Sequence, residues 1–373
     1  MRLIISGGGT GGHIYPALAL ARYIDKNMPG AKILFVGAQG GMEEKIIPRS
    51  GYPLKTLPVK GFPRKLSPRL AESFFLLGRS STRAWRIIEE FDPDYIIGTG
   101  GFAAAPVLLA AILRRRNTII HEQNVVPGLT NRFLAPFVDK VCLSFETSRK
   151  YFVKKGNVYV TGNPRASEVG KIGKDSAREI LNLEGDVPAV LAVGGSRGAE
   201  NLNKAVVDFL IAAARNGSAK NLQVLYITGE LYYREIYSLL KQEGVLNQFG
   251  SYLQLYPYFQ QMPLAWASAD IAISRAGATT LAEITAIGVP SIIVPSPNVT
   301  NDHQLINARE LSKQGAAVVM EEKDINGGLL LAKISEMLNN PSLLEQMQEN
   351  NRRLSFPRAA ENIAAFLGYN KRG

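Results

Sequence analysis

Residues 3–24 read LIISGGGTGGHIYPALALARYI, and this stretch decides the fold. Its first three residues are aliphatic and predict a buried strand, and the five glycines around Thr10 predict a tight turn after it. Apolar residues then recur at helical spacing, which predicts an amphipathic helix from Ile14 to Ile24. A strand, a glycine turn and a helix N-terminus direct backbone N–H groups at one point, where an anion binds. His13 places an imidazole at that point, so the stretch predicts a site that holds a negative ligand and can also move a proton.

Residues 7–12 also fit the G-x-G-x-x-G fingerprint of dinucleotide-binding enzymes. That fingerprint requires an acidic residue at the end of the second strand, where it binds a ribose. The expected second strand, Ile33–Gly37, is followed by the uncharged residues 38–42, and the acids Glu43 and Glu44 come only later. A nicotinamide-dependent dehydrogenase is therefore an unfavoured alternative.

Strand-like apolar runs alternate with helical patterns along the whole chain, which is typical of parallel sheets covered by helices. In the first half the expected strands are Leu3–Ser6, Ile33–Gly37, Tyr95–Gly98, Thr118–His121, Lys140–Ser144 and Val158–Thr161. In the second half they are Ala189–Val193, Gln223–Thr228, Tyr252–Tyr256, Asp270–Ser274, Ser291–Pro295 and Ala317–Met320. These strands are too many for one doubly wound sheet, so two sheets of about six strands each are expected.

The opening pattern recurs at residues 189–199, AVLAVGGSRGA. We therefore predict an α/β protein with two Rossmann-like domains whose parallel sheets face a central cleft. The expected domains are residues 1–163 and 164–354, with a last helix at about 355–373 that packs back on the first domain. Ligands in such sheets bind beyond the carboxyl ends of the strands, so both glycine turns are expected at the cleft.

Charge is distributed unevenly along the 373 residues. Residues 1–163 hold 23 Lys and Arg against 11 Asp and Glu, whereas residues 164–373 hold 20 against 21. The basic half is expected to meet an anionic partner, either nucleic acid or an anionic membrane surface. With one cysteine, Cys142, no apolar leader and no long apolar run, we expect a cytoplasmic protein without a spanning helix.

Residues 60–86 combine seven basic side chains with an apolar cluster and one acid, Glu72. This pattern predicts a membrane-docking surface made of Phe74, Phe75, Leu76, Leu77, Arg79 and Arg83. The alternative is an ordinary core face with solvated basic residues opposite it. Nucleic-acid binding is not predicted, because aromatic residues that stack on bases are presented singly rather than in a cluster.

Residues 270–283, DIAISRAGATTLAE, repeat the order of strand, glycine turn and helix. The N-terminus of that helix is a candidate anion site. Glu283, about one turn inside the helix, can accept hydrogen bonds from a ribose diol. The alternative is a capping box between Thr280 and Glu283.

Polar residues follow other expected strands as well. His303 and Gln304 suit sugar hydroxyls, or else they stand in a solvated loop. Residues 121–124, HEQN, bind a ligand or form a buried polar network. Residues 92–94, Asp-Pro-Asp, precede a strand and are interpreted as a turn rather than as a metal-binding motif. Three well-separated histidines and one cysteine predict no metal site.

Six short motifs occur in one order along the chain: GGTGGH at 8–13, GTGGF at 98–102, HEQN at 121–124, GNPR at 162–165, GGSRGA at 194–199 and SRAGA at 274–278. Together they resemble the MurG family of GT-B glycosyltransferases, from the first strand to the last helix. The resemblance implies inverting transfer of N-acetylglucosamine (GlcNAc) from UDP-GlcNAc to the C4 hydroxyl of undecaprenyl-pyrophosphoryl-N-acetylmuramoyl-pentapeptide (lipid I), which gives lipid II for peptidoglycan synthesis. It also implies a peripheral protein on the cytoplasmic face of the cell membrane, with an anionic membrane surface and cell-wall synthesis and division proteins as partners.

The family's donor contacts carry over onto the residues that match its motifs. They are Thr10, Gly11, Gly12, Asn124, Arg165, Ser196, Phe259, Ala278, Thr279, Thr280, Leu281, Ala282, Glu283, His303 and Gln304. The sequence departs from the family at residues 259–261, where the family often has acidic and aliphatic residues, and at His303, where some members have glutamine. Inverting transfer requires a base, for which His13 is the candidate and Glu122 the runner-up, and the scheme requires no metal or cofactor.

Two other functions fit the same residues. One is a different GT-B enzyme, such as a glycolipid synthase or a nucleotide-sugar epimerase, although an epimerase has no use for a basic apolar surface. The other is a non-catalytic, membrane-peripheral sensor of nucleotide sugars, which would keep Ser196 and Glu283 but has no need of His13.

Overall fold

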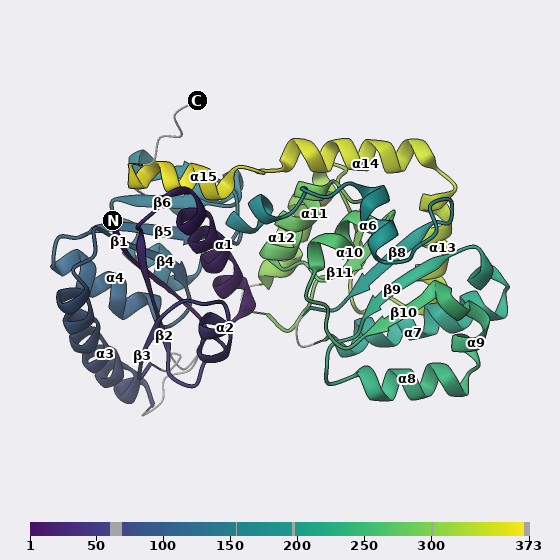
Figure 1. The fold of residues 1–373 in the computed structure, drawn as a ribbon, viewed down its shortest axis with the longest axis horizontal. Coiled ribbons are helices and arrows are strands. Elements are labelled where there is room, and N and C mark those ends of the chain that lie inside the picture. The colour runs from purple at the N-terminus through teal and green to yellow at the C-terminus, as the bar shows by residue number, and fades with distance from the viewer. Residues whose placement is uncertain (60–68, 154, 196–197, 300–301, 369–373) are drawn as a thin grey trace. The chain divides into compact units, whose positions relative to one another are not determined.

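The computed structural model describes residues 1–59, 69–153, 155–195, 198–299 and 302–368. The chain divides into two compact units (Figure 1). Unit 1 comprises Met1–Ser167 and Arg358–Gly373, and unit 2 comprises Glu168–Pro357. Each unit is built on one parallel sheet with helices between successive strands, which confirms the predicted α/β class with two Rossmann-like domains.

The sheet of unit 1 has seven strands in the order β3-β2-β1-β4-β5-β6-β7. Their bounds are β1 (Arg2–Gly7), β2 (Lys32–Ala38), β3 (Leu54–Leu57), β4 (Tyr95–Gly100), β5 (Asn117–Glu122), β6 (Lys140–Leu143) and β7 (Val158–Val160). The expectation of six strands was wrong by one, because β3 was missed. Lys55 and Thr56 interrupt its two leucines, so this four-residue edge strand carries too little apolar signal of its own.

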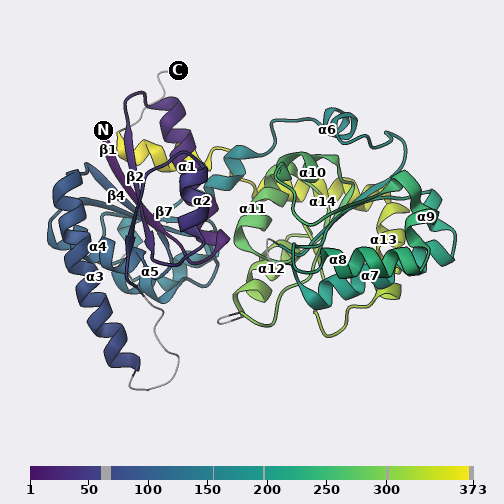
Figure 2. The same ribbon diagram turned by 60° about the horizontal axis from the view of Figure 1, so that its bottom comes forward.

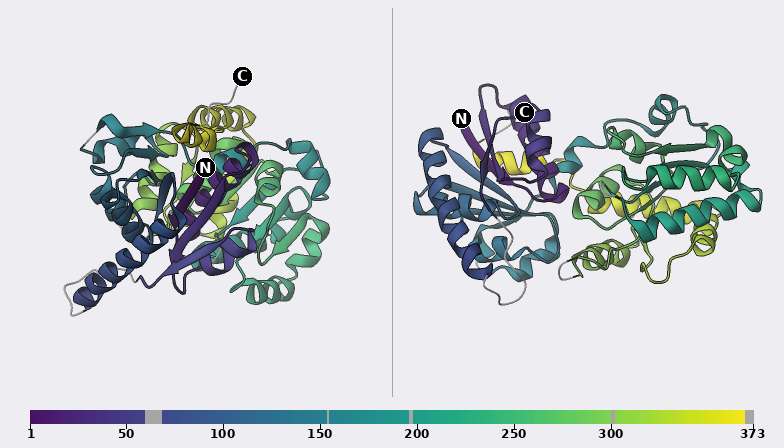
Figure 3. Two further views of the ribbon diagram at one scale, coloured as in Figure 1. Left: turned by 60° about the vertical axis from the view of Figure 1, so that its left-hand side comes forward. Right: turned by 90° about the horizontal axis from the view of Figure 1, so that it is seen from below.

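Successive residues of β1 point to opposite faces of the sheet, as the period of a strand requires. Ile4 packs in a core with the helices α3 (Arg69–Phe91), α4 (Ala104–Leu113) and α5 (Leu129–Leu134). Leu3 and Ile5 pack on the other face with α1 (Gly11–Asn27), α2 (Glu43–Arg49) and α15 (Ala359–Ala364). The chain thus returns to unit 1 at its C-terminal end, where α15 lies beside α1 (Figures 1 and 3).

Short 3-10 helices complete unit 1 at η1 (Glu146–Tyr151), η2 (Lys155–Asn157), η3 (Pro164–Glu168) and η7 (Ala365–Leu367). Among the residues described, no helix is both long and apolar enough to cross a bilayer.

The sheet of unit 2 has the six expected strands, in the order β10-β9-β8-β11-β12-β13. They are β8 (Ala189–Val193), β9 (Gln223–Ile227), β10 (Leu253–Tyr256), β11 (Ile271–Ser274), β12 (Ser291–Ile293) and β13 (Val318–Val319). The helices of this unit are α6 (Lys174–Ile180), α7 (Glu200–Arg215), α8 (Tyr233–Gln242), α9 (Val245–Phe249), α10 (Met262–Ser268), α11 (Ala278–Ile287), α12 (His303–Lys313), α13 (Gly327–Leu338) and α14 (Pro341–Leu354), with the 3-10 helices η4 (Ser218–Lys220) and η5 (Gly250–Tyr252).

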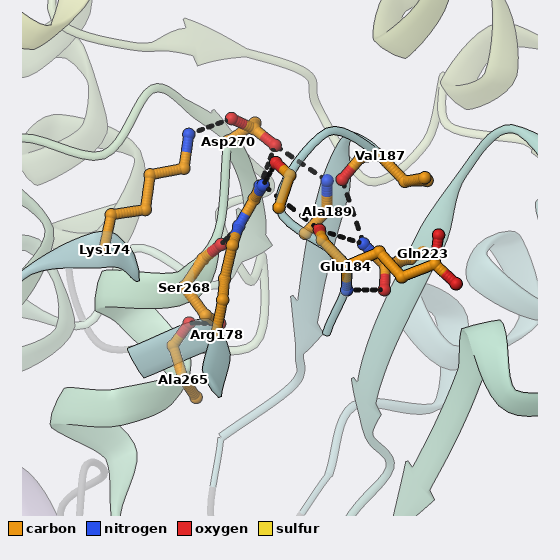
Figure 4. Close-up of polar contacts among 10 residues, drawn as sticks. Lys174, Arg178, Glu184, Val187, Ala189, Gln223, Ala265, Ser268 and Asp270 are labelled. Carbon is orange, nitrogen blue, oxygen red and sulfur yellow. Dashed lines mark hydrogen bonds and ion pairs between the residues drawn. The ribbon is translucent and has the colours of Figure 1, made fainter. Parts of the chain in front are cut away.

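A partly buried ion-pair network closes the amino ends of β8 and β11 (Figure 4). The Asp270 carboxylate accepts hydrogen bonds from the Ala189 N–H at 2.7 Å and from the Arg178 guanidinium at 2.5 Å, and it also pairs with Lys174. Arg178 is buried and donates in addition to the Ser268 carbonyl. These contacts fasten α6 to the edge of the sheet opposite the carboxyl ends of the strands, so this edge has a structural role.

Candidate functional site

The loops that follow the strands lie at one edge of each sheet, because all the strands of a sheet run parallel. In unit 1 the loops after β1, β4 and β5 are neighbours, since those strands are adjacent in the sheet order. In unit 2 the loops after β8, β11 and β12 are neighbours for the same reason. The candidate residues therefore fall into two groups, one at the carboxyl edge of each sheet.

His13 lies in the first turn of α1, directly after the glycine turn. Its Nδ1 is 3.0 Å from the Gly8 carbonyl oxygen and 3.4 Å from the Thr10 hydroxyl. Because a carbonyl oxygen only accepts, the shorter contact requires Nδ1 to carry the proton in the neutral ring. Nε2 then holds a lone pair, and in the described part of the chain it has no hydrogen-bond partner. This tautomer suits a base.

Two glycines after β4 make room for the imidazole and for the glycine turn. A Cβ on Gly100 would lie 2.9 Å from His13 Nε2, and a Cβ on Gly101 would lie 2.4 Å from the Gly8 carbonyl oxygen. Both glycines also have positive φ, at 101° and 85°. The motif at 98–102 is thus the wall against which the first turn packs.

Glu43 is fully buried beneath the first glycine turn, and sequence reasoning missed it. One carboxylate oxygen accepts the Gly9 N–H at 2.9 Å, and the other accepts the Ala38 N–H at 2.7 Å. A Cβ on Gly8 or Gly41 would lie within 2.5 Å of this carboxylate. A backbone N–H that would meet a dinucleotide phosphate is thus already bound by a carboxylate of the protein, which disfavours the dehydrogenase alternative.

His121 belongs to a buried polar network. Its Nε2 donates to the Gly162 carbonyl at 3.0 Å, and its Nδ1 accepts from the Gln123 amide at 2.9 Å. Gln123 in turn donates to the Thr99 carbonyl. Burial lowers the pKa of His121 to about 4, with the Gly162 bond acting in the opposite direction and repulsion from His13 adding to the shift. His121 is therefore neutral near pH 7 and joins strands β5, β7 and β4 at their carboxyl ends.

Glu122 is also buried, and its carboxylate binds the following loop. One oxygen accepts the Asn124 N–H at 2.9 Å, and the other accepts the Gly128 N–H at 3.0 Å and the Asn131 amide at 2.8 Å. These bonds set the start of α5 and hold the backbone of Asn124. The geometry favours the polar-network interpretation for Glu122, which leaves His13 as the better placed base.

In unit 2, α11 begins at Ala278 without a side-chain cap and without an acid in its first turn. Thr280 lies inside the helix rather than at its N-cap, so the capping-box alternative is wrong. Glu283 is nearly buried and accepts the Trp266 indole N–H at 2.9 Å. Trp266, fully buried in α10, was not singled out from the sequence, because a tryptophan in an apolar run reads as ordinary core.

Arg275, which follows β11, is not available to a ligand. Its guanidinium pairs with the nearly buried Glu322 and donates to the Val294 carbonyl at 3.1 Å. Glu322 also accepts from Asn201 in the first turn of α7, at 2.7 Å. Arg275 and Glu322 thus join the loops after β11, β12 and β13 to the start of α7.

The remaining expected donor contacts are placed as follows. Gln304 accepts the Ser296 N–H at 2.9 Å, which fixes its amide, and His303 begins α12 half-buried. Phe259 follows β10 and packs edge-on against Tyr256, with 5.0 Å between ring centroids. Ser196 lies outside the described residues.

Among the residues expected in unit 1, Arg165 in η3 stands over the Tyr15 ring at 5.9 Å. Thr10 is the N-cap of α1, and Gly11 and Gly12 open that helix. Together with His13 and Asn124, these residues lie after strands β1, β5 and β7 of unit 1.

The expected docking residues lie on α3, whose N-terminal part extends past the strands of unit 1 (Figure 2). Phe75 is 70% exposed, Arg79 and Arg83 are exposed, and Leu76 and Leu77 are half-buried. The side chain of Phe74 lies outside the described residues.

The candidate metal motif at 92–94 lies at the amino end of β4. Asp94 binds the backbone of Arg2 and Asp92 pairs with Arg116, which fits the turn interpretation. Within the described ranges, no three His, Cys, Asp or Glu side chains are grouped as metal ligands would be.

Comparison with known proteins covers both units. Residues 3–143 match the model of the glycosyltransferase family 28 N-terminal domain, and residues 189–363 match that of its C-terminal domain. The UDP-N-acetylglucosamine--N-acetylmuramyl-(pentapeptide) pyrophosphoryl-undecaprenol N-acetylglucosamine transferase of Caldanaerobacter subterraneus subsp. tengcongensis is 46% identical over 363 residues, covering 97% of this chain and 98% of that protein. The Bacillus pumilus protein of the same name is 42% identical over 365 residues, or 97% of each chain.

Solved structures agree with the sequence relatives. MurG of Acinetobacter baumannii superposes with a TM-score of 0.76 at 26% identity, covering 98% of this chain and 99% of that one. The UDP-GlcNAc 2-epimerase of Neisseria meningitidis bound to UDP-GlcNAc gives a TM-score of 0.66 at 14% identity, covering 99% and 100%, and so shares the fold alone.

Proposed function

The chain belongs to glycosyltransferase family 28, and we propose that it transfers GlcNAc from UDP-GlcNAc to the C4 hydroxyl of lipid I, giving lipid II for peptidoglycan synthesis. The observation that carries this conclusion is 46% identity over almost the full length to a transferase named for that reaction. It is a UDP-GlcNAc-dependent glycosyltransferase of GT-B fold. The likeness to the epimerase is one of fold alone.

Inverting transfer is a single displacement at the anomeric carbon of GlcNAc. The acceptor oxygen forms a bond to that carbon while the bond to the diphosphate breaks and UDP leaves. The hydroxyl proton passes to a base, a role we assign to His13 Nε2 because Nδ1 is bound to the Gly8 carbonyl. Imidazole suits this step near neutral pH.

Most of the expected donor contacts lie in unit 2 in this proposal. The uncapped N-terminus of α11 directs N–H groups at the diphosphate, where charge develops as UDP leaves. The Glu283 carboxylate accepts the ribose hydroxyls, and the Trp266 indole N–H, bound to Oε2 at 2.9 Å, orients it. Gln304 and His303, at the start of α12, contact the sugar. The remaining donor contacts are those expected from the motifs, Ser196 and Phe259 among them.

We also infer that α3 docks unit 1 on an anionic membrane surface. Phe75, Arg79 and Arg83 are exposed on one helix, and this half of the chain carries the whole excess of positive charge. An acceptor anchored in the membrane by its lipid requires the enzyme at that surface. We accordingly propose that the protein is peripheral on the cytoplasmic face and works beside the cell-wall synthesis and division proteins.

The first experiment is transfer of radiolabelled GlcNAc from UDP-GlcNAc to a soluble lipid I analogue with EDTA present. A lipid II-type product supports donor, acceptor and metal independence together. Binding of UDP-GlcNAc without any product would refute lipid I as acceptor and favour the sensor.

Docking is tested by vesicle sedimentation with and without anionic lipid. Phe75→Asp is expected to lower the bound fraction on anionic vesicles. Leu329→Asp, at an exposed apolar position of unit 2, is the matched control and should leave binding unchanged. Equal binding by both variants would refute the docking surface.

A further inference from the structure

The peptide bond between Gly8 and Gly9 is hydrogen-bonded at both of its ends. Its N–H, on Gly9, donates to Glu43 Oε2 at 2.9 Å, and its C=O, on Gly8, accepts from His13 Nδ1 at 3.0 Å. We propose that Glu43 is a positioning residue that acts on His13 through this peptide, in a chain of carboxylate, amide and imidazole. The proposal rests on the proposed function, in which His13 accepts the acceptor's proton.

A carboxylate is the group that this position requires. Both partners of Glu43, the Gly9 and Ala38 amides, are donors, and an ionised carboxylate offers acceptors only. In the described residues Glu43 has no ion pair, so its negative charge is not cancelled by a neighbouring cation. A glutamine would turn its NH₂ toward one of the two N–H groups and lose that bond.

This series of hydrogen bonds from Glu43 to His13 acts on the imidazole in two ways. Hydrogen bonds in series polarise one another, so a carboxylate on Gly9 N–H strengthens the Gly8 carbonyl as an acceptor for His13 Nδ1–H. That bond selects the tautomer in which Nε2 is the proton acceptor. When Nε2 takes the proton, the positive charge forms one peptide away from the buried carboxylate, which stabilises it.

The surrounding glycines keep this arrangement rigid. A Cβ on Gly8, Gly37 or Gly41 would come within 2.5 Å of the Glu43 side chain, so a larger residue at any of the three would displace it. On the other side, a Cβ on Gly101 would meet the Gly8 carbonyl oxygen at 2.4 Å. The competing contact of His13 Nδ1, to the Thr10 hydroxyl, is longer at 3.4 Å and would leave two acceptors facing each other at Gly8.

The tautomer of His13 is measured directly by ¹⁵N NMR of histidine-labelled protein at a pH where the ring is neutral. His13→Asn identifies its signals among the three histidines. We expect a protonated Nδ1 and an unprotonated Nε2 in the wild-type protein. A protonated Nε2 would overturn the proposal without any change at Glu43.

Glu43→Gln tests the carboxylate, and Glu44→Gln, the exposed neighbouring acid, is the matched control. In Glu43→Gln we expect the tautomer preference to weaken and kcat to fall by about 10- to 100-fold, part of what general-base catalysis supplies, with the KM for UDP-GlcNAc within twofold. Glu44→Gln should have the tautomer preference, the kcat and the KM for UDP-GlcNAc of the wild type. An unchanged tautomer and kcat in folded Glu43→Gln would refute the proposal.

Should Glu43→Gln not fold, the hydrogen-bond series can be tested at the Gly9 amide proton, which Glu43 accepts. Its chemical shift is expected to lie downfield, as for a charge-assisted bond, and to move in His13→Asn, whereas no movement would overturn the coupling. The proposed function fails separately: wild-type protein that makes no lipid II-type product refutes the reaction, whatever the tautomer shows.

Discussion

The same local motif occurs at β1–α1 in unit 1 and at β11–α11 in unit 2, yet the buried carboxylates at the two junctions have different hydrogen-bond partners. Both helices begin without a side-chain cap bond and without an acid in the first turn. In unit 1 the buried carboxylate of Glu43 already binds an N–H of the turn. In unit 2 the buried carboxylate of Glu283, inside α11, is bound by the Trp266 indole N–H instead. In the proposed function, unit 1 therefore carries its own anion and supplies the base, whereas the helix N-terminus of unit 2 binds the anion of the donor.

The largest effect is expected from His13→Asn, which removes the proposed base from unit 1 and leaves the proposed donor contacts of unit 2 in place. The value of kcat should fall by about 10²- to 10⁴-fold, while the affinity for UDP-GlcNAc changes less than twofold. Steady-state transfer kinetics and calorimetry with UDP-GlcNAc measure the two quantities. A kcat within threefold of the wild type would mean that His13 only orients a substrate.

Acid is expected to weaken unit 1 through His121. Its pKa is lowered to about 4 when folded, from 6.5, so the folded state binds fewer protons than the unfolded state between these values. The free energy of unfolding therefore has its full value above pH 6.5. It falls by about 3 kcal/mol as the pH is lowered toward 4, because the unfolded state then binds a proton that the folded state does not.

The measurement is the urea unfolding free energy at pH 7.5, 6 and 5 in the Trp266→Phe background, where Trp85 reports on unit 1. His121→Gln supplies the control, since it should flatten this dependence. An equal slope in both proteins would assign the loss to other groups.

Glu283→Ala tests the other junction. Loss of the proposed ribose contact should raise the KM for UDP-GlcNAc by about 10- to 100-fold, since hydrogen bonds to a charged group contribute about 1.5–3 kcal/mol each. The kcat should change much less than in His13→Asn. A larger fall in kcat than in donor affinity would contradict the division of labour between the two junctions.

Trp266→Phe is the mildest of the changes. It removes the N–H that holds Glu283 but keeps an aromatic ring in the core, so a rise in donor KM of about three- to tenfold is expected. Trp85→Phe, at the other tryptophan of the chain, changes a partly exposed ring of unit 1 and should leave donor KM unchanged. Identical donor KM in both variants would show that Glu283 needs no support from the indole.

Much of the fold could be predicted from the sequence, because the spacing of apolar residues differs between strands and helices. Both sheets, their parallel strands and the helix after each glycine turn follow from residues close together in the chain. The miss was β3, a four-residue edge strand that is held mainly by its pairing with β2, from Phe35 opposite Leu54 to Ala38 opposite Leu57. Pairing with the neighbouring strand stabilises such a strand more than its own residue pattern does.

Some residues of the candidate site could likewise be predicted from the sequence, and others could not. Glycines, His13 and Glu283 stand out in the sequence because each is unusual at the place where it occurs. Glu43 and Trp266 do not, since an acid at the start of a helix and a tryptophan in an apolar run are ordinary. Sequence reasoning also left Glu122 open as a base, and its three bonded loop partners appear only in the fold.

By itself, the sequence determined the two α/β units, the position of each glycine turn and the family of the chain, because these depend on local spacing and ordered motifs. Only the tertiary structure decided which N–H groups of those turns are already bound and which carboxylates are committed to the protein itself. Glu43 reaches Gly9 across 34 residues, and Trp266 reaches Glu283 from a different helix. Strand order and packing decide which residues become such partners. One hydrogen bond then determines whether an N–H of the turn is already bound to a carboxylate of the protein or can bind an anionic ligand.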